Sequence, residues 1–258
     1  MSRIEEKFKE VLGRKGKAFI PYVMAGDPDL QRTKEVVAIL EECGADIIEL
    51  GVPFSDPLSD GPTIQKAAQR ALGEGVTLRK VIEFVGDLRK STQTPIVLMT
   101  YYNPIFRYGE ERFVRDASAA GVDGIIVPDL PPDEAGSLLS FSKNAGFDII
   151  FLVAPTSTGE RIKKVARTSR GFIYYVSITG ITGSKLSVDP SIGSHIKKVR
   201  KTGRKPVAVG FGISTPEEAA EIARIADGVI IGSAIVKRMK DPDEDLKKYL
   251  NALRQAIR

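Results

Sequence analysis

The sequence has few of the residues that build disulfides, metal sites and redox centres. Its 258 residues include one cysteine, one histidine and no tryptophan. A single cysteine cannot form an internal disulfide, and one cysteine with one histidine cannot make a zinc site. Cys43 lies at helical spacing from Leu40, so we expect a core thiol, and we expect His195 to be an ordinary helix residue. We predict a metal-free protein of a reducing compartment, the cytoplasm.

Long apolar runs and a strong charge of one sign are also missing. No stretch approaches the roughly 20 consecutive apolar residues of a membrane span, and the N-terminus shows no secretory signal. The net charge is +5 at pH 7, and the basic residues of the range 161–205 lie on helix-like segments without interleaved aromatic residues. This pattern favours a solvated face over a nucleic-acid site. We therefore expect no membrane and no nucleic acid partner.

Eight short apolar segments recur, near residues 18, 46, 95, 124, 148, 172, 206 and 228. Helical patterns separate them, and the joints "CGADIIEL", "AGVDGIIVP" and "AGFDIIFLV" run from a glycine helix cap through Asp into a β-branched run. Apolar strands that alternate with helices are typical of parallel sheets covered by helices. The pattern predicts an α/β protein, one (β/α)8 TIM barrel domain over residues 1–258, with extra N-terminal and loop helices. A doubly wound sheet is the alternative, but no G-x-G-x-x-G follows the first strand.

Two acids in "IIELGVPFSDPLSDG", residues 47–61, are the candidate catalysts. Glu49 lies at the C-terminal end of the second expected strand, where barrel active sites are built. If its side chain faces the barrel interior, desolvation raises its pKa and suits it to proton transfer near neutral pH. Asp60 fits catalysis and capping of a helix that begins near Pro62 equally well. Asp56 fits a turn or an interface better than catalysis.

Three glycine-containing turns follow the sixth, seventh and eighth expected strands, at residues 179–183, 210–214 and 231–234. Loops after the last two strands of a barrel, with the start of a short helix, usually bind phosphate, and Ser233 can open such a helix. No lysine lies inside an expected strand, which argues against a Schiff base. These residues predict acid/base catalysis by carboxylates on an organic phosphate.

Five segments carry a family resemblance: "PYVMAGDPD", "IIELGVPFSDPLSDGPTIQ", "ITGITG", "GFGIS" and "IGSAIV". In this order, over essentially the whole chain, they resemble the tryptophan synthase α subunit. The resemblance implies a lyase of tryptophan biosynthesis that splits indole-3-glycerol phosphate into indole and glyceraldehyde 3-phosphate by a retro-aldol reaction. It places the two catalytic carboxylates on Glu49, as acid and base, and on Asp60, which would accept the indole N–H.

The resemblance also implies the remainder of the site. The phosphate-binding residues would be Gly183, Gly212, Gly232 and Ser233. The pocket and lid residues would be Tyr22, Ile64, Met99, Tyr174, Thr182 and Phe211. Two positions depart from the common pattern: Ile178 stands where many members have Arg, and Tyr22 stands where Phe is common. The first departure bears on closure of the loop after the sixth strand, and the second adds a polar group to the indole pocket.

A partner is implied as well. The family pairs α with a β subunit that holds pyridoxal phosphate, in an α2β2 assembly, and the α chain itself would bind no cofactor. Pro53, Phe54, Asp56 and Pro57 would then face the β subunit. Two alternatives stay open on the sequence: another phosphate-binding barrel of biosynthesis, such as a sugar-phosphate isomerase, and a barrel that only activates its partner. The fifth expected strand ends without the acid that an isomerase needs, and the two candidate acids argue against an inactive barrel.

Overall fold

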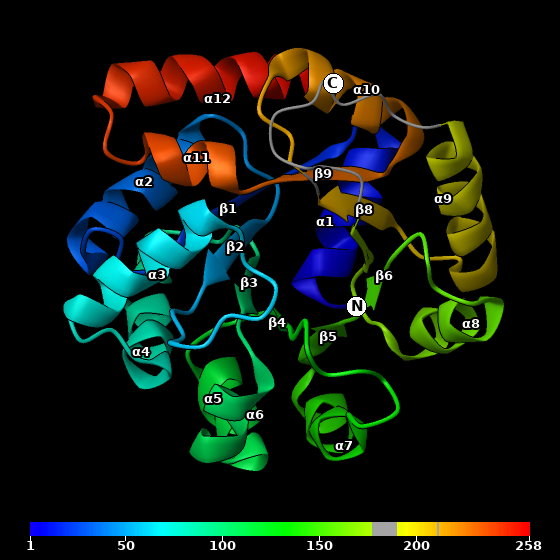
Figure 1. Cartoon of the computed structure of the whole chain (residues 1–258), viewed down its shortest axis with the longest axis horizontal. Coiled ribbons are helices and arrows are strands. Elements are labelled where there is room, and N and C mark those ends of the chain that lie inside the picture. Colours follow the sequence, from blue (N-terminus) through cyan, green and yellow to red (C-terminus); the bar gives the residue numbers. More distant parts are fainter. Residues whose placement is uncertain (177–189, 211) are drawn as a thin grey trace.

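Parallel strands form the centre of the molecule, and helices surround them (Figure 1). The computed structural model describes residues 1–176, 190–210 and 212–258. The strands are β1 (Ala18–Met24), β2 (Ile48–Gly51), β3 (Ile96–Met99), β4 (Gly124–Ile126), β5 (Asp148–Ile150), β6 (Leu152–Val153), β7 (Ile173–Val176), β8 (Val207–Gly210) and β9 (Gly228–Ile231). Their order in the sheet is β5-β4-β3-β2-β1-β9-β8-β7-β6, and every pair is parallel. The predicted barrel is confirmed.

The strand expected near residue 148 is divided at Phe151, so the described residues form nine strands where eight were predicted. β5 pairs with β4, and β6 pairs with β7. At the division, the backbone N–H of Tyr174 donates to the carbonyl oxygen of Phe151 over 3.2 Å. Because β5 and β6 follow each other directly in the chain, they join the two ends of the sheet and close the barrel.

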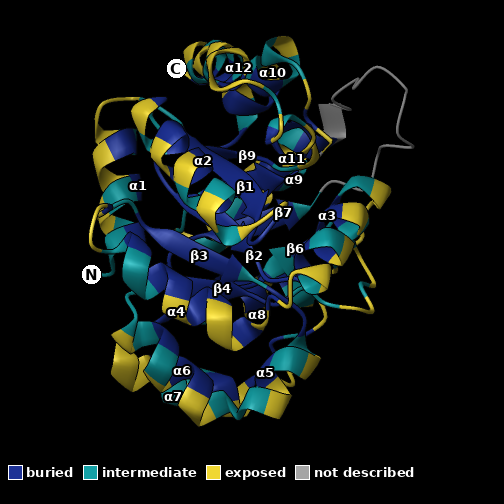
Figure 2. Cartoon of the chain, turned by 90° about the vertical axis from the view of Figure 1, so that its left-hand side faces the viewer, coloured by how far each residue is buried: buried dark blue, intermediate teal, exposed yellow. Residues whose placement is uncertain are grey.

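Helices cover the outside of the barrel and one of its ends. They are α1 (Arg3–Gly13), α2 (Leu30–Glu42), α3 (Pro62–Gly73), α4 (Leu78–Leu88), α5 (Tyr102–Tyr108), α6 (Glu110–Ala119), α7 (Gly136–Ala145), α8 (Gly159–Thr168), α9 (Pro190–Gly203), α10 (Pro216–Ile225), α11 (Ser233–Arg238) and α12 (Asp243–Ile257). The extra N-terminal and loop helices that the sequence predicts are α1 and α3. Figure 2 shows buried residues on the strands and on the inner helix faces, with exposed residues outside.

The core has two parts, one between the strands and the outer helices and one inside the barrel. Ile20, Ile47 and Val97 belong to the inner part, which α1 closes with Ile4 and Phe8. In Figure 1, α1 is seen through the centre of the ring of strands. Because side chains alternate along a strand, Glu49 shares the inner face with Ile47, as the sequence predicts. The filled end of the barrel leaves the C-terminal ends of the strands as the place for a site.

Other sequence-based expectations have clear outcomes within the described part of the chain. Cys43 is a free thiol buried in the core. His195 lies on α9, and its Nδ1 is 3.0 Å from the hydroxyl group of Tyr175. Over the described ranges, no helix has both the length and the apolar character that crossing a membrane requires. His, Cys, Asp and Glu side chains of the same ranges form no group of three or more suited to a metal ion.

Candidate active site

A cavity of about 670 Å³ opens at the C-terminal ends of the strands. Nine of the predicted site residues line it: Tyr22, Glu49, Asp60, Ile64, Met99, Tyr174, Gly212, Gly232 and Ser233. The other predicted pocket residues, Thr182, Gly183 and Phe211, lie outside the described residues, as does Ile178. The structure therefore brings together residues from β1, β2, β3, β7 and the segments that follow β2, β8 and β9.

Glu49 lines this cavity at a fully buried position. It is 0% exposed, and its neighbours across the sheet are Tyr22 of β1 and Val97 of β3. Neither of its carboxyl oxygens has a hydrogen-bond partner among the described residues. Burial, and secondarily the charge of Asp60, raise the pKa of Glu49 to about 8. The prediction of a raised pKa is confirmed, and the group can both give and take a proton near neutral pH.

Asp60 reaches the same cavity from the loop between β2 and α3. The residue that caps α3 is Gly61, without a side-chain hydrogen bond, so the helix-capping interpretation of Asp60 is wrong. The side-chain amide of Gln65 donates to the backbone carbonyl of Asp60 over 2.7 Å, and Asp60 lines the cavity. Burial raises the pKa of Asp60, and a hydrogen bond from Tyr101 opposes that rise.

Two buried tyrosines wall the cavity, each lying over a glycine of a neighbouring strand. A Cβ atom on Gly51 would lie 2.1 Å from the hydroxyl oxygen of Tyr22, and one on Gly210 would lie 2.2 Å from that of Tyr174. Any side chain at either glycine would displace the ring. Burial raises the pKa of both phenols well above 10, so both hydroxyl groups keep their protons.

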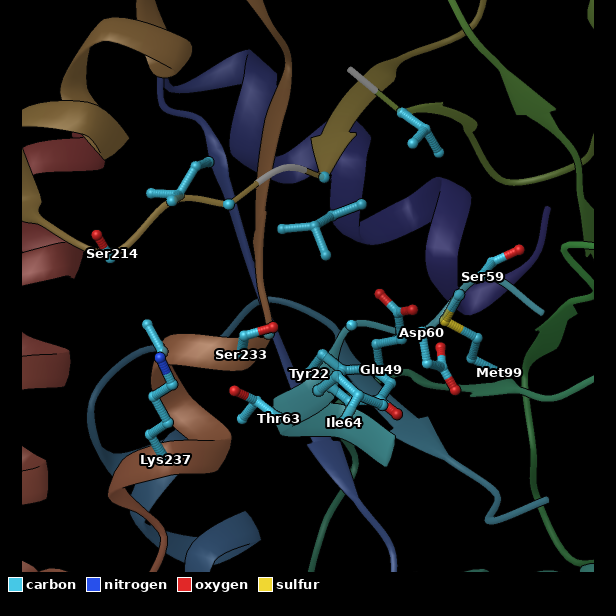
Figure 3. A pocket seen from close by; sticks show the side chains of 18 of the residues that line it. Tyr22, Glu49, Ser59, Asp60, Thr63, Ile64, Met99, Ser214, Ser233 and Lys237 are labelled. Atoms are coloured by element: carbon cyan, nitrogen blue, oxygen red, sulfur yellow. The ribbon is translucent and has the colours of Figure 1, made fainter. Parts of the chain in front are cut away.

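The cavity has two chemically different ends. In Figure 3, Ser214, Ser233 and Lys237 lie on one side, and Glu49 and Asp60 lie on the other. α11 begins at Ser233, directly after β9, as the sequence predicts. Among the lining residues that the sequence reasoning did not name as site residues are Thr63, Ser214, Lys237 and Arg238, whose side chains can donate hydrogen bonds. The spacing of Lys237, four residues after Ser233, places both on one helix face and could have identified the lysine.

The loop expected to face a partner is only partly exposed in this chain. Pro53 is buried and Phe54 is half-buried, with its ring 5.6 Å from that of Tyr101. Pro57 is half-buried, and Asp56 is exposed and accepts a hydrogen bond from Ser55. The large apolar side chain that this loop exposes is Leu58, at 80%, which the sequence reasoning did not name.

The family model of the tryptophan synthase alpha chain matches residues 8–258. The chain belongs to the tryptophan synthase alpha chain family. The tryptophan synthase alpha chains of Citrifermentans bemidjiense and Geobacter sulfurreducens are 52% and 50% identical to it, over 100% of this chain and 98% and 99% of theirs. The solved tryptophan synthase subunit alpha of Legionella pneumophila superposes with a TM-score of 0.91 at 37% identity, covering 100% of this chain and 98% of that one.

A chain of the aminoacrylate-bound tryptophan synthase of Mycobacterium tuberculosis gives the same TM-score of 0.91 at 38% identity, with both chains fully covered. Membership in the tryptophan synthase alpha chain family makes this chain a carbon–carbon lyase of tryptophan biosynthesis that cleaves indole-3-glycerol phosphate. The isomerase and the inactive barrel, which the sequence left open, are thereby set aside.

Proposed function

We propose that Glu49 and Asp60 perform the retro-aldol cleavage of indole-3-glycerol phosphate in this chain. The observation that carries the proposal is the pair itself: a fully buried carboxyl group with a pKa of about 8 shares a cavity with a second carboxylate. Glu49 is therefore protonated at neutral pH, while the hydrogen bond from Tyr101 favours the ionised form of Asp60.

Glu49 gives one proton and takes one back in the reaction, so it returns to its starting protonation state. As a neutral acid it protonates C3 of the indole ring, and as a carboxylate it then takes the proton of the 3′-hydroxyl group. The electron pair of the C3–C3′ bond returns to the ring as that bond breaks, and the carbonyl group of glyceraldehyde 3-phosphate forms. Asp60 accepts the ring N–H and so stabilises the positive charge that the protonated ring carries.

The two ends of the cavity suggest how the substrate lies. Met99 and Ile64 offer apolar contact for the indole ring beside the two acids. Ser233 and Lys237 offer a hydroxyl group and an ammonium group at the other end, where Gly232 directly precedes Ser233 and Gly212 lies two residues before Ser214. Phosphate binding at this second end puts the scissile bond over Glu49.

The proposal includes a β partner that holds pyridoxal phosphate, an α2β2 assembly and a cytoplasmic location. Its support in this chain is two exposed large apolar side chains, Leu58 on the loop after β2 and Phe106 on α5. Exposed large apolar side chains that gather into one patch mark protein interfaces. Cys43 is the chain's one cysteine, and a buried free thiol fits a reducing compartment.

The test compares wild type, Glu49→Gln and Asp60→Asn in the cleavage of indole-3-glycerol phosphate by the isolated chain. Loss of the acid and base should lower kcat by about 10³-fold, and loss of the N–H acceptor by about 10²-fold. Because the chain has no tryptophan, the fluorescence of the indole ring reports binding and release directly. Asp129→Asn is the control, since Asp129 follows β4 at the same edge of the barrel without lining the cavity. Unchanged turnover in Glu49→Gln would refute the assignment.

A further inference from the structure

We propose that Tyr249 of α12 is a positioning residue for the phosphate end of the cavity. Its hydroxyl group is bonded to the segment that follows β8, and its ring lies against an arginine of α11, the helix that follows β9. One side chain thereby fixes the spacing between the two segments to which the proposed function assigns the phosphate group, and the role rests on that assignment. Tyr249 is not among the residues that line the cavity, so it touches no reacting atom.

The hydroxyl group of Tyr249 holds the backbone that follows β8. It donates to the carbonyl oxygen of Ser214 over 2.9 Å. The other polar groups of Ser214 are bound to Glu218 of α10, whose Oε2 accepts the Ser214 backbone N–H over 2.7 Å and the Ser214 hydroxyl group over 3.0 Å. Two helices, α10 and α12, therefore hold Ser214, and Gly212, which also lines the cavity, lies two residues before it.

The ring of Tyr249 contacts α11. Cζ of Arg238 lies 4.0 Å from the ring centroid, within the range of a cation–π contact. Nη1 of the same arginine donates to the carbonyl oxygen of Ala234 over 2.9 Å. Because α11 has six residues, fewer than two turns, a contact that fixes Arg238 also constrains Ser233 at the other end of the helix.

Tyr249 is itself firmly placed. Leu246 and Leu253 of the same helix are fully buried, and Tyr249 packs against the core that they belong to. Arg32 of α2 pairs with Asp243, in the first turn of α12, at 2.7 Å. Figure 1 shows α12 beside α10 and α11, so one anchored helix supports both segments of the phosphate end.

The spacing between these segments matters because one phosphate group would contact both of them. A binding site keeps its affinity only while its groups stay within about 0.5 Å of their productive positions. The phosphate group does not react, so its contacts are the same in the ground state and the transition state. Loosening the spacing should therefore raise KM and leave kcat unchanged. Binding of the indole ring, at the end with Ile64 and Met99, should not change.

The experiment is the variant Tyr249→Phe, which removes the hydroxyl group and keeps the ring against Arg238. We expect KM for indole-3-glycerol phosphate and the inhibition constant of inorganic phosphate to rise about fivefold each. The kcat value and the inhibition constant of indole should be those of wild type. Tyr249→Leu also removes the ring and should raise the first two constants about threefold further.

Tyr108→Phe is the matched control. The hydroxyl group of Tyr108 donates to Asp116 over 2.9 Å, and Cζ of Arg112 lies 5.1 Å from its ring centroid. Tyr108 thus has the same two kinds of contact, but it does not line the cavity and contacts neither segment of the phosphate end. All four constants should equal those of wild type.

A variant of the cavity itself separates the positioning role from the phosphate assignment. Ser233→Asp places a carboxylate at the proposed phosphate end and should raise the inhibition constant of inorganic phosphate at least about tenfold. If it does so while Tyr249→Phe leaves that constant unchanged, or weakens phosphate and indole equally, only the positioning role is overturned. If Ser233→Asp leaves the constant unchanged, the phosphate assignment fails, and the role of Tyr249 fails with it.

Discussion

Glu49 is placed where its charged form costs free energy. Its pKa is about 8 in the folded chain, against 4.5 for an ordinary glutamate. Between these pH values the folded chain holds a proton that the unfolded chain has released, so the stability of the fold decreases as the pH rises. A difference of that size corresponds to about 5 kcal/mol lost above pH 8, and to nothing below about pH 4.5. The residue that destabilises the fold in this way is the residue that we assign to proton transfer.

Replacement by a neutral isostere should therefore stabilise the protein. We expect Glu49→Gln to raise the free energy of unfolding above that of wild type by several kcal/mol at about pH 9, and by much less at about pH 5. Urea unfolding at the two pH values measures the difference. The exposed Glu42, on α2, provides the control variant Glu42→Gln, whose effect should not grow with pH. Equal stabilisation of Glu49→Gln at both pH values would show that its carboxyl group is not desolvated in solution.

Among the elements, the joints between helices and strands show why the sequence pattern predicts the barrel so well. The Asp that precedes a strand accepts a backbone N–H from the start of the neighbouring strand. The pairs are Asp46 with Phe19 at 2.9 Å, Asp123 with Ile96 at 2.7 Å and Asp227 with Val207 at 2.9 Å. Each carboxylate also pairs with an arginine: Arg254, Arg89 and Arg200, respectively. These aspartates therefore fix the strand register at the end of the barrel opposite the cavity.

Asp123 provides the test of this register role, because its carboxylate pairs with Arg3 at 2.6 Å as well as with Arg89. Asp123→Asn should lower the free energy of unfolding by about 3 kcal/mol, since a half-buried arginine network loses its counter-charge. The folded fraction should keep the wild-type kcat. Asp87→Asn removes a carboxylate that also pairs with two cations, Lys34 and Lys90, but at an exposed position, and should have little effect on urea unfolding. Equal losses in both variants would contradict a register role.

The same elements show which features could be predicted from the sequence and which could not. Apolar runs, glycine caps and the preceding Asp are local signals, and they predicted the strands and the placement of Glu49. The division at Phe151 and the hydrogen bond from the Ser59 amide to the hydroxyl group of Tyr101 depend on distant segments that meet only in the fold. Tyr101 is 42 positions after Ser59, and no periodicity connects them.

At the scale of the whole molecule, the two ends of the barrel have different roles. α1 and the aspartates stabilise one end, and the cavity occupies the other. Leu58 and Phe106, 80% and 65% exposed, lie on the loop after β2 and on α5, the two segments that Tyr101 joins. A partner seated on these side chains would contact the loop that carries Asp60 and the helix bonded to that loop through Tyr101. The proposed β subunit is therefore expected to raise the activity of this chain as well as to bind it.

The double variant Leu58→Ser, Phe106→Ser separates binding from intrinsic catalysis. The isolated variant should fold and release indole at the wild-type rate, because neither side chain lines the cavity. Its apparent Kd for the β subunit should increase at least about tenfold, and activation at a fixed β concentration should fall with it. Asn251→Ser, an exposed change on α12 across the barrel from α5 in Figure 1, is the control. Wild-type activation of the double variant would place the β contact elsewhere on the surface.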